Sequence, residues 1–199
     1  MDSVWIWIAG VLGFGLCFLY DINSFRWRSR ILSPGFGIGC LLIAAATCMA
    51  VAEAALAGRI GGVADWTLLS LAVLSLAGLI YALFFALPFT DTYTKQTDGR
   101  PVCDRGAYAL CRHPAAIPFV LLYLFLGLAL LPGKFWIAAA VFSLLELLYI
   151  WYQDRITFPK TFCDYPEYRK KVPFLIPTRA SVRNAIETGK KMTGKKEMP

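Results

Sequence analysis

The stretch Gly106–Pro114, with the sequence Gly-Ala-Tyr-Ala-Leu-Cys-Arg-His-Pro, lies where a polar loop turns into a long apolar run, and it contains the chain's single histidine. A histidine beside Arg112 at such a junction is expected in the headgroup layer of a membrane. There a charged cofactor can arrive from water and an apolar substrate from the bilayer. The stretch therefore marks a candidate active site. The structural alternative is that Arg112 reaches headgroups and His113 caps the helix that begins at Pro114.

The composition predicts a membrane protein, because 58% of the 199 residues are hydrophobic and only 17% are charged. Several apolar runs have the roughly 17–25 residues that a helix needs to cross a hydrocarbon core. We expect an all-α integral membrane protein with about five transmembrane helices. The predicted spans cover residues 4–20, 36–57, 66–89, 114–131 and 135–152. The linker Pro132–Gly133 is so short that the last two spans should form a tight antiparallel hairpin.

The distribution of charge predicts the orientation. If the N-terminus is outside, all Lys and Arg residues except Arg59 and Lys134 fall on the cytoplasmic side, so the C-terminus is expected in the cytoplasm. Residues 1–153 would form the transmembrane domain. Residues 154–178, where aromatic and charged residues alternate, would form a small cytoplasmic cap. Residues 179–199 would form a flexible basic tail on anionic lipid.

Two binding classes are not expected. The net charge of +7 is explained by contact with anionic lipid, because the basic residues cluster beside the predicted spans, and we predict no nucleic-acid partner. The six cysteines form no C-x-x-C pair, and Cys17, Cys40 and Cys48 lie inside apolar runs. We therefore predict neither a disulfide framework nor a metal site.

A second group of polar residues follows the end of the last predicted span. Glu146, Tyr149 and Gln153 fall on one helical face, and Asp154 comes next. A carboxylate in lipid costs a few kcal/mol, so Glu146 should point into the helix bundle. A purely structural pairing of Glu146 with another helix is the alternative. In the predicted hairpin, the Arg112–His113 pair should face the segment 153–155 across a short gap, as a cofactor site requires.

Two separated patterns carry a family resemblance. Gly106-Ala-Tyr108 with Arg112-His113-Pro114, and later Asp154-Arg155, Phe162 to Tyr165, Tyr168, Val172-Pro173 and Pro177, resemble the integral-membrane methyltransferases related to isoprenylcysteine carboxyl methyltransferase. The resemblance covers roughly residues 103–178. It implies a helical membrane enzyme that takes S-adenosylmethionine from the cytosol and methylates a lipid or a prenylated small molecule. It assigns the cofactor contacts to Tyr108, His113, Asp154, Tyr165 and Tyr168.

The chain also departs from that family's pattern. Ala116 and Pro118 stand where the family usually has tyrosine and glycine, Arg155 replaces the second glutamate of a pair, and Cys163 replaces a glycine. Losing a carboxylate and gaining a cation would weaken recognition of a cofactor that is cationic at sulfur. Either the pocket is rearranged or the activity has changed.

Two kinds of substrate remain open for an in-line displacement at the sulfonium methyl group. A carboxylate nucleophile needs no general base, and Arg112 or Arg155 would orient it. An amine nucleophile needs a proton acceptor, for which Glu146 is the candidate. The predicted catalytic residues are therefore Arg112, Arg155 and Glu146.

Two other functions are alternatives. Membrane reductases that use NADPH resemble the same C-terminal arrangement, and the cofactor phosphates would need cations such as Arg155, Lys160, Arg169 and Lys170. The other alternative is a non-catalytic adaptor or lipid binder whose cofactor site has eroded at Ala116, Pro118 and Arg155.

Overall fold

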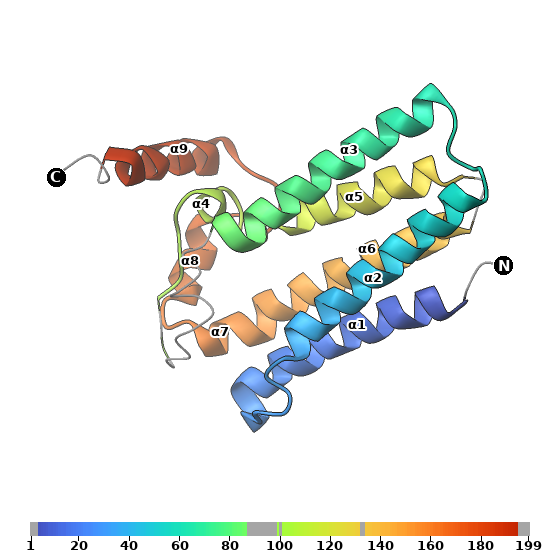
Figure 1. The fold of residues 1–199 in the computed structure, drawn as a ribbon. Helices are drawn as coiled ribbons and strands as arrows, with labels where there is room; N and C mark the ends of the chain where they lie inside the picture. Colours follow the sequence, from blue (N-terminus) through green and yellow to red (C-terminus); the bar gives the residue numbers. More distant parts are fainter. Residues whose placement is uncertain (1–3, 87–98, 100, 132–133, 195–199) are drawn as a thin grey trace. The chain divides into compact units, whose positions relative to one another are not determined.

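The computed structural model describes residues 4–86, 99, 101–131 and 134–194 of the chain, and these residues fold into helices joined by turns and loops (Figure 1). Four of the described helices are long and apolar enough to cross a membrane: Val4–Trp27, Gly35–Leu56, Val63–Phe85 and Phe135–Thr161. A shorter apolar helix covers Ala116–Ala129. For the described residues, the expected all-helical class is confirmed, and so is the presence of several helices long and apolar enough to span a membrane. The end of the third predicted span, the linker Pro132–Gly133 and the last residues of the tail lie outside the described residues.

The helix bounds follow the predicted spans closely, and short π-helical segments (η) extend three of the α-helices. At the ends of the first and the last predicted span these segments carry the helix further than predicted. The elements are α1 (Val4–Ile22), η1 (Asn23–Trp27), α2 (Gly35–Leu56), α3 (Val63–Ile80), η2 (Tyr81–Phe85), α4 (Ala107–Leu110), α5 (Ala116–Ala129), α6 (Phe135–Tyr152), η4 (Gln153–Thr157), α7 (Phe158–Thr161), α8 (Tyr165–Lys171) and α9 (Arg179–Gly194). Such segments often occur near functional sites because they interrupt the regular hydrogen-bond ladder.

The chain divides into two compact units. Unit 1 comprises Met1–Leu76 and Phe119–Thr157, and unit 2 comprises Ala77–Pro118 and Phe158–Pro199. Residues 158–178 of the predicted cap therefore belong to the same unit as the segment around His113, whereas residues 154–157 belong to unit 1. Unit 2 also contains α9, so the structure places a helix over most of the tail that we expected to be flexible.

The start of α9 has a local cause. The backbone N–H of Thr178 donates to Oγ of Ser181 at 2.9 Å, and the backbone N–H of Ser181 donates to Oγ1 of Thr178 at 3.2 Å. This reciprocal pair satisfies two N–H groups that a helix start would otherwise leave without partners.

Unit 1 is built on a close crossing of α1 and α2, which lie side by side (Figure 1). The crossing depends on two glycines that face each other. A Cβ atom at Gly13 would lie 2.7 Å from the carbonyl oxygen of Gly39, and one at Gly39 would lie 2.5 Å from the carbonyl oxygen of Gly13. Small residues at membrane helix crossings let backbones approach in this way.

An aromatic core joins α1, α5 and α6 within unit 1. The rings of Phe14 and Phe119 meet edge to face at 6.0 Å, and those of Tyr123 and Phe142 do so at 5.4 Å. The hydroxyl groups of Tyr123 and Thr47 lie 2.6 Å apart, which satisfies the buried phenol.

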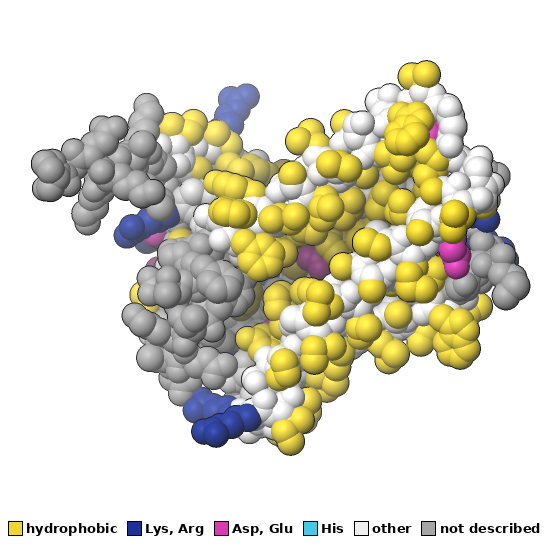
Figure 2. Space-filling model, viewed as in Figure 1, with side chains coloured by type: hydrophobic (Ala, Val, Ile, Leu, Met, Phe, Trp, Pro, Cys, Tyr) yellow, Lys and Arg dark blue, Asp and Glu magenta, His cyan; other side chains and the backbone are white. Residues whose placement is uncertain are grey.

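The outer surface of unit 1 is apolar. Large hydrophobic side chains such as Trp5, Leu41 and Leu74 are exposed. In Figure 2, hydrophobic side chains cover the visible faces of α1 and α2, and Lys and Arg gather at the end where these two helices are joined. This pattern suits contact with lipid along the helices and with headgroups at their joined end.

The glycine crossing generates a matched pair of variants. Gly39→Ala should lower the thermal unfolding temperature in detergent by several degrees, because overpacking a tight contact costs about 1–3 kcal/mol. Gly37→Ala, two residues away, places its Cβ atom in open space and should not lower that temperature. Equal melting temperatures for the two variants would contradict the close crossing.

Candidate functional site

The Arg112–His113 segment is positioned by a tight turn in unit 2. Gly106 has φ +57° and ψ −127°, a conformation that a residue with a side chain adopts only under strain. The turn starts the short helix α4, and Cys111 then returns the chain to an extended conformation. Gly106 thus sets the direction in which the chain continues from the turn to the buried Arg112 and His113.

Arg112 binds this segment to the C-terminal end of α8. Its backbone N–H donates to the carbonyl oxygen of Pro173 at 2.9 Å. Its Nη1 atom donates to the carbonyl oxygens of Val172 at 2.7 Å and Arg169 at 3.1 Å. Its guanidinium also lies 5.5 Å from the centre of the Phe174 ring. A cation at the last carbonyls of a helix is favourable, because these carbonyls lack partners in the helix and form its negative end.

Two further contacts fasten the same segments. The hydroxyl of Tyr168 donates to the carbonyl oxygen of Tyr108 at 2.6 Å. The backbone N–H of Val102 donates to Oδ1 of Asp164 at 2.8 Å. Burial raises the pKa of the Tyr168 phenol, which therefore remains a neutral donor over the physiological pH range. The segment 106–114 and the second pattern from Phe162 onward thus lie in one folded unit, whereas Asp154 and Arg155 belong to the other.

His113 lies in an aromatic environment. Only 5% of its surface is exposed, and its ring stacks on Phe158 with centres 5.6 Å apart. Phe174 approaches the same ring edge-on at 5.1 Å. The imidazole is held in one orientation by rings from the C-terminal segment, as a residue that positions a ligand requires.

The predicted site residues divide between the two units. Unit 2 brings together five of them: Tyr108, Arg112, His113, Tyr165 and Tyr168. Unit 1 holds the other three: Glu146, Asp154 and Arg155. Asp154 is buried in η4, Arg155 is exposed on the same segment, and Glu146 is half-buried near the thiols of Cys17 and Cys40. The expected approach of the unit 1 residues to His113 stays a prediction.

Asp21 is a buried acidic residue that the sequence did not indicate as a candidate, because the first span was expected to end at Tyr20. The structure extends that helix, and Asp21 is only 4% exposed. The hydroxyl of Thr157 donates to its Oδ2 atom at 3.4 Å, and Tyr149 and Gln153 are further neighbours. In the sequence, Asp21 could have been identified as a candidate only from its position as an acidic residue directly after an apolar run.

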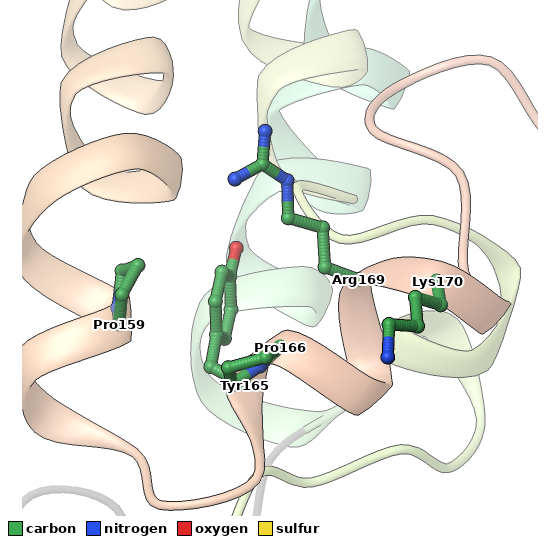
Figure 3. A pocket seen from close by; sticks show the side chains of 5 residues that line it. All are labelled: Pro159, Tyr165, Pro166, Arg169 and Lys170. Carbon is green, nitrogen blue, oxygen red and sulfur yellow. The ribbon is translucent and has the colours of Figure 1, made fainter.

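Helix α8 has a pocket along each of two sides. Asp164, Glu167 and Lys171 line one pocket of about 150 Å³, together with Val102, Asp104, Tyr168, Val172 and Asn184; we call it the acidic pocket. The other pocket, of about 440 Å³, we call the basic pocket; it is lined by Pro159, Tyr165, Pro166, Arg169 and Lys170 (Figure 3). The spacing explains the division, since residues three or four apart share a helix face.

One ion pair connects these two sides of α8. The Nζ atom of Lys170 lies 2.7 Å from Oε1 of Glu167, and this contact lowers the pKa of the Glu167 carboxyl. Both side chains are largely exposed, so the pair contributes little to stability. Among the described residues, no cluster of His, Cys, Asp and Glu could hold a metal ion.

Comparison of the chain with models of protein families, with curated proteins and with solved structures gave no match.

The arginine contact can be tested by a conservative substitution. Arg112→Lys should lower the free energy of unfolding by about 1–3 kcal/mol, because lysine keeps the charge but lacks the planar fork that reaches two carbonyl oxygens. Limited proteolysis should then cut more readily between residues 158 and 178. The exposed Arg105, in the same unit, provides the control Arg105→Lys. Equal protease sensitivity of both variants would show that the side-chain contacts of Arg112 do not hold the C-terminal segment in place.

Cysteine labelling tests the packing beneath α4. Burial raises the pKa of the Cys111 thiol, and a hydrogen bond from the backbone N–H of His113 offsets part of the rise. Because the thiolate is the reactive form, the raised pKa and the burial both slow the reaction at pH 7. In variants that retain one cysteine each, a maleimide should label the exposed Cys163 quickly and Cys111 only after unfolding. Equal labelling rates would exclude the described packing.

Proposed function

We propose that this chain is a membrane methyltransferase that transfers the methyl group of S-adenosylmethionine to a lipid-embedded substrate. One observation carries the proposal: the first pattern of the family resemblance and the part of the second pattern from Phe162 onward, far apart in sequence, contact each other in unit 2, which also holds the buried His113. The contacts of Arg112 with Arg169 and Val172, and of Tyr168 with Tyr108, make that junction. Their convergence is what a cofactor site built from both patterns would require.

The acidic pocket is the best-suited part of unit 2 for the cationic groups of the cofactor. S-adenosylmethionine carries positive charge at sulfur and at its amino group, and Asp104, Asp164 and Glu167 line this pocket. Pockets that enclose a whole ligand of this size usually exceed about 300 Å³. The pocket of about 150 Å³ would therefore hold one end of the cofactor.

Roles for the predicted site residues follow from this proposal. Tyr108, Tyr165 and Tyr168 would offer aromatic or hydroxyl contacts to the cofactor, and His113 would orient it. Arg112 already uses Nη1 on two carbonyl oxygens, so we assign it the positioning of His113. Asp154 would accept the cofactor's amino group by the family resemblance.

The substrate remains a lipid or a prenylated small molecule with a carboxylate or an amine as the nucleophile. Arg155 would orient a carboxylate, and Glu146 would accept the proton from an amine. The departures at Ala116, Pro118, Arg155 and Cys163 stand within or beside these segments. They favour a pocket rearranged relative to the family, and a non-catalytic lipid binder is the corresponding alternative.

The proposal includes a topology of five spans with the N-terminus outside. Helix α5 would be the fourth span, although it is shorter than the other four. Unit 2 would then present His113 and α8 to the cytoplasm, where the cofactor is dissolved. The concentration of Lys and Arg in the same segments supports this orientation.

A second candidate function has one observation in its favour. Arg169 and Lys170, two of the four cations predicted for NADPH phosphates, line the same pocket. If the chain is a reductase, these two cations would contact the phosphates of NADPH, and the chain would bind NADPH and not S-adenosylmethionine.

Equilibrium binding of S-adenosylmethionine to the full chain in nanodiscs tests the proposal. We expect saturable binding that His113→Phe and Asp154→Asn each weaken at least about tenfold, a loss of about 1.4 kcal/mol. Phenylalanine keeps the aromatic packing with Phe158, so the fold should survive. The exposed Glu187 in unit 2 provides the control Glu187→Gln, which should bind normally.

Two results would contradict the methyltransferase. The first is no binding at millimolar cofactor by a protein that elutes as a single folded species. The second is selective binding of NADPH, which would establish the reductase instead.

A further inference from the structure

The side of α8 that carries the basic pocket is chemically different from the acidic side. Tyr165, Pro166, Arg169 and Lys170 follow the i, i+1, i+4, i+5 spacing of one helical face. Among the described residues, no acidic side chain lines this pocket, whereas three acidic residues line the other one. The two pockets should therefore select ligands of opposite charge.

The groups that line the basic pocket are fixed to different degrees. Tyr165 is only 1% exposed, and its ring packs against Phe158 and Phe162 at 5.6 and 6.3 Å. Figure 3 shows the guanidinium of Arg169 extending on the same side as the hydroxyl end of Tyr165, with Pro159 across from them. The tyrosine thus provides a rigid wall beside which the arginine lies.

Lys170 is the cation of the basic pocket whose present contact can be exchanged for a ligand. Its ammonium group lies apart from the guanidinium of Arg169 in Figure 3, and it contacts Glu167 at 2.7 Å. That ion pair is exposed and therefore weak. A lysine on a flexible four-carbon stem can exchange such a contact for a bound anion.

These groups suit an anion with several oxygen atoms. A guanidinium carries five N–H donors and an ammonium group three, and neither can accept a hydrogen bond. A phosphate offers enough acceptors for both groups, and the planar guanidinium matches two of its oxygens. The walls formed by Pro159, Pro166 and the Tyr165 ring are apolar, so they suit the carbon atoms of an ester. The volume of about 440 Å³ leaves room for both parts.

We propose that the basic pocket binds the phosphate group of an organic phosphate ester. The ester can be a phospholipid headgroup or a water-soluble phosphate, and the chemistry that recognises it is the same. This inference does not rest on the proposed methyl transfer, because none of its steps uses S-adenosylmethionine.

Calorimetric titration of the full chain in an uncharged detergent tests the proposal with two probes. Dihexanoyl phosphatidic acid represents the lipid source, and glycerol 3-phosphate represents the soluble source. Dihexanoylglycerol and glycerol are the matched compounds without phosphate. Each phosphate probe that binds should do so saturably and more tightly than its neutral counterpart.

The variants separate the pocket from general attraction to positive charge. Arg169→Ala should weaken phosphate binding at least about tenfold, and Lys170→Ala about threefold, because arginine makes the paired contact. Lys171→Ala removes the same charge one residue further on, but Lys171 lines the acidic pocket and should change affinity less than about twofold. Arg169→Gln, which retains most of the side chain's length, checks that any loss is not caused by misfolding.

The outcomes decide both the site and its ligand. Binding of the lipid probe alone supports the pocket and identifies a headgroup. Binding of glycerol 3-phosphate, alone or as tightly as the lipid probe, supports the pocket and shows that a soluble phosphate ester is sufficient. The proposal is overturned if neither probe binds saturably. It is also overturned if Lys171→Ala weakens binding as much as Arg169→Ala does, since that result would show attraction to charge without a defined site.

Discussion

The contact of Arg112 with the main-chain oxygens at the end of α8 is the interaction on which the rest of unit 2 depends. A buried guanidinium requires oxygen partners, and the carbonyl groups of Arg169, Val172 and Pro173 meet the residue at its side chain and its backbone. This requirement fixes the end of α8 against the loop before α5. It thereby fixes the ring environment of His113 and the two sides of α8 that carry the pockets.

Unit 1 is stabilised by a different kind of contact. Its crossing of α1 and α2 is made by Gly13 and Gly39, whose backbones approach more closely than any side chain would allow. Lipid tails are as apolar as the side chains they surround, so close packing has to provide what the hydrophobic effect provides in water. Buried polar groups are the exception within this unit, and one of them, Asp21, lies where α1 continues into η1.

Much of the fold could be predicted from the sequence, because long apolar runs permit few structures other than membrane helices. The convergence of residues 106–114 with the C-terminal segment was expected from the predicted hairpin, which brings both to one membrane face, and from a family resemblance. The partners of Arg112 could not be predicted, since they are carbonyl groups that every residue carries. The helix end beyond Tyr20 was missed because Asp21 resembles the start of a loop. The sequence contains the spacing of the capping pair Thr178 and Ser181 and of the two faces of α8. These features could be assigned only once the bounds of the helices were known.

Hydrogen exchange at the backbone amide of Arg112 tests most directly whether the two distant segments form one unit. That N–H is bonded to Pro173, and no regular helix would otherwise protect it. We predict that it exchanges far more slowly in the intact protein than in a peptide of the same sequence, and that Arg112→Lys accelerates the exchange. Exchange of this amide at the peptide rate in the folded protein would contradict the account.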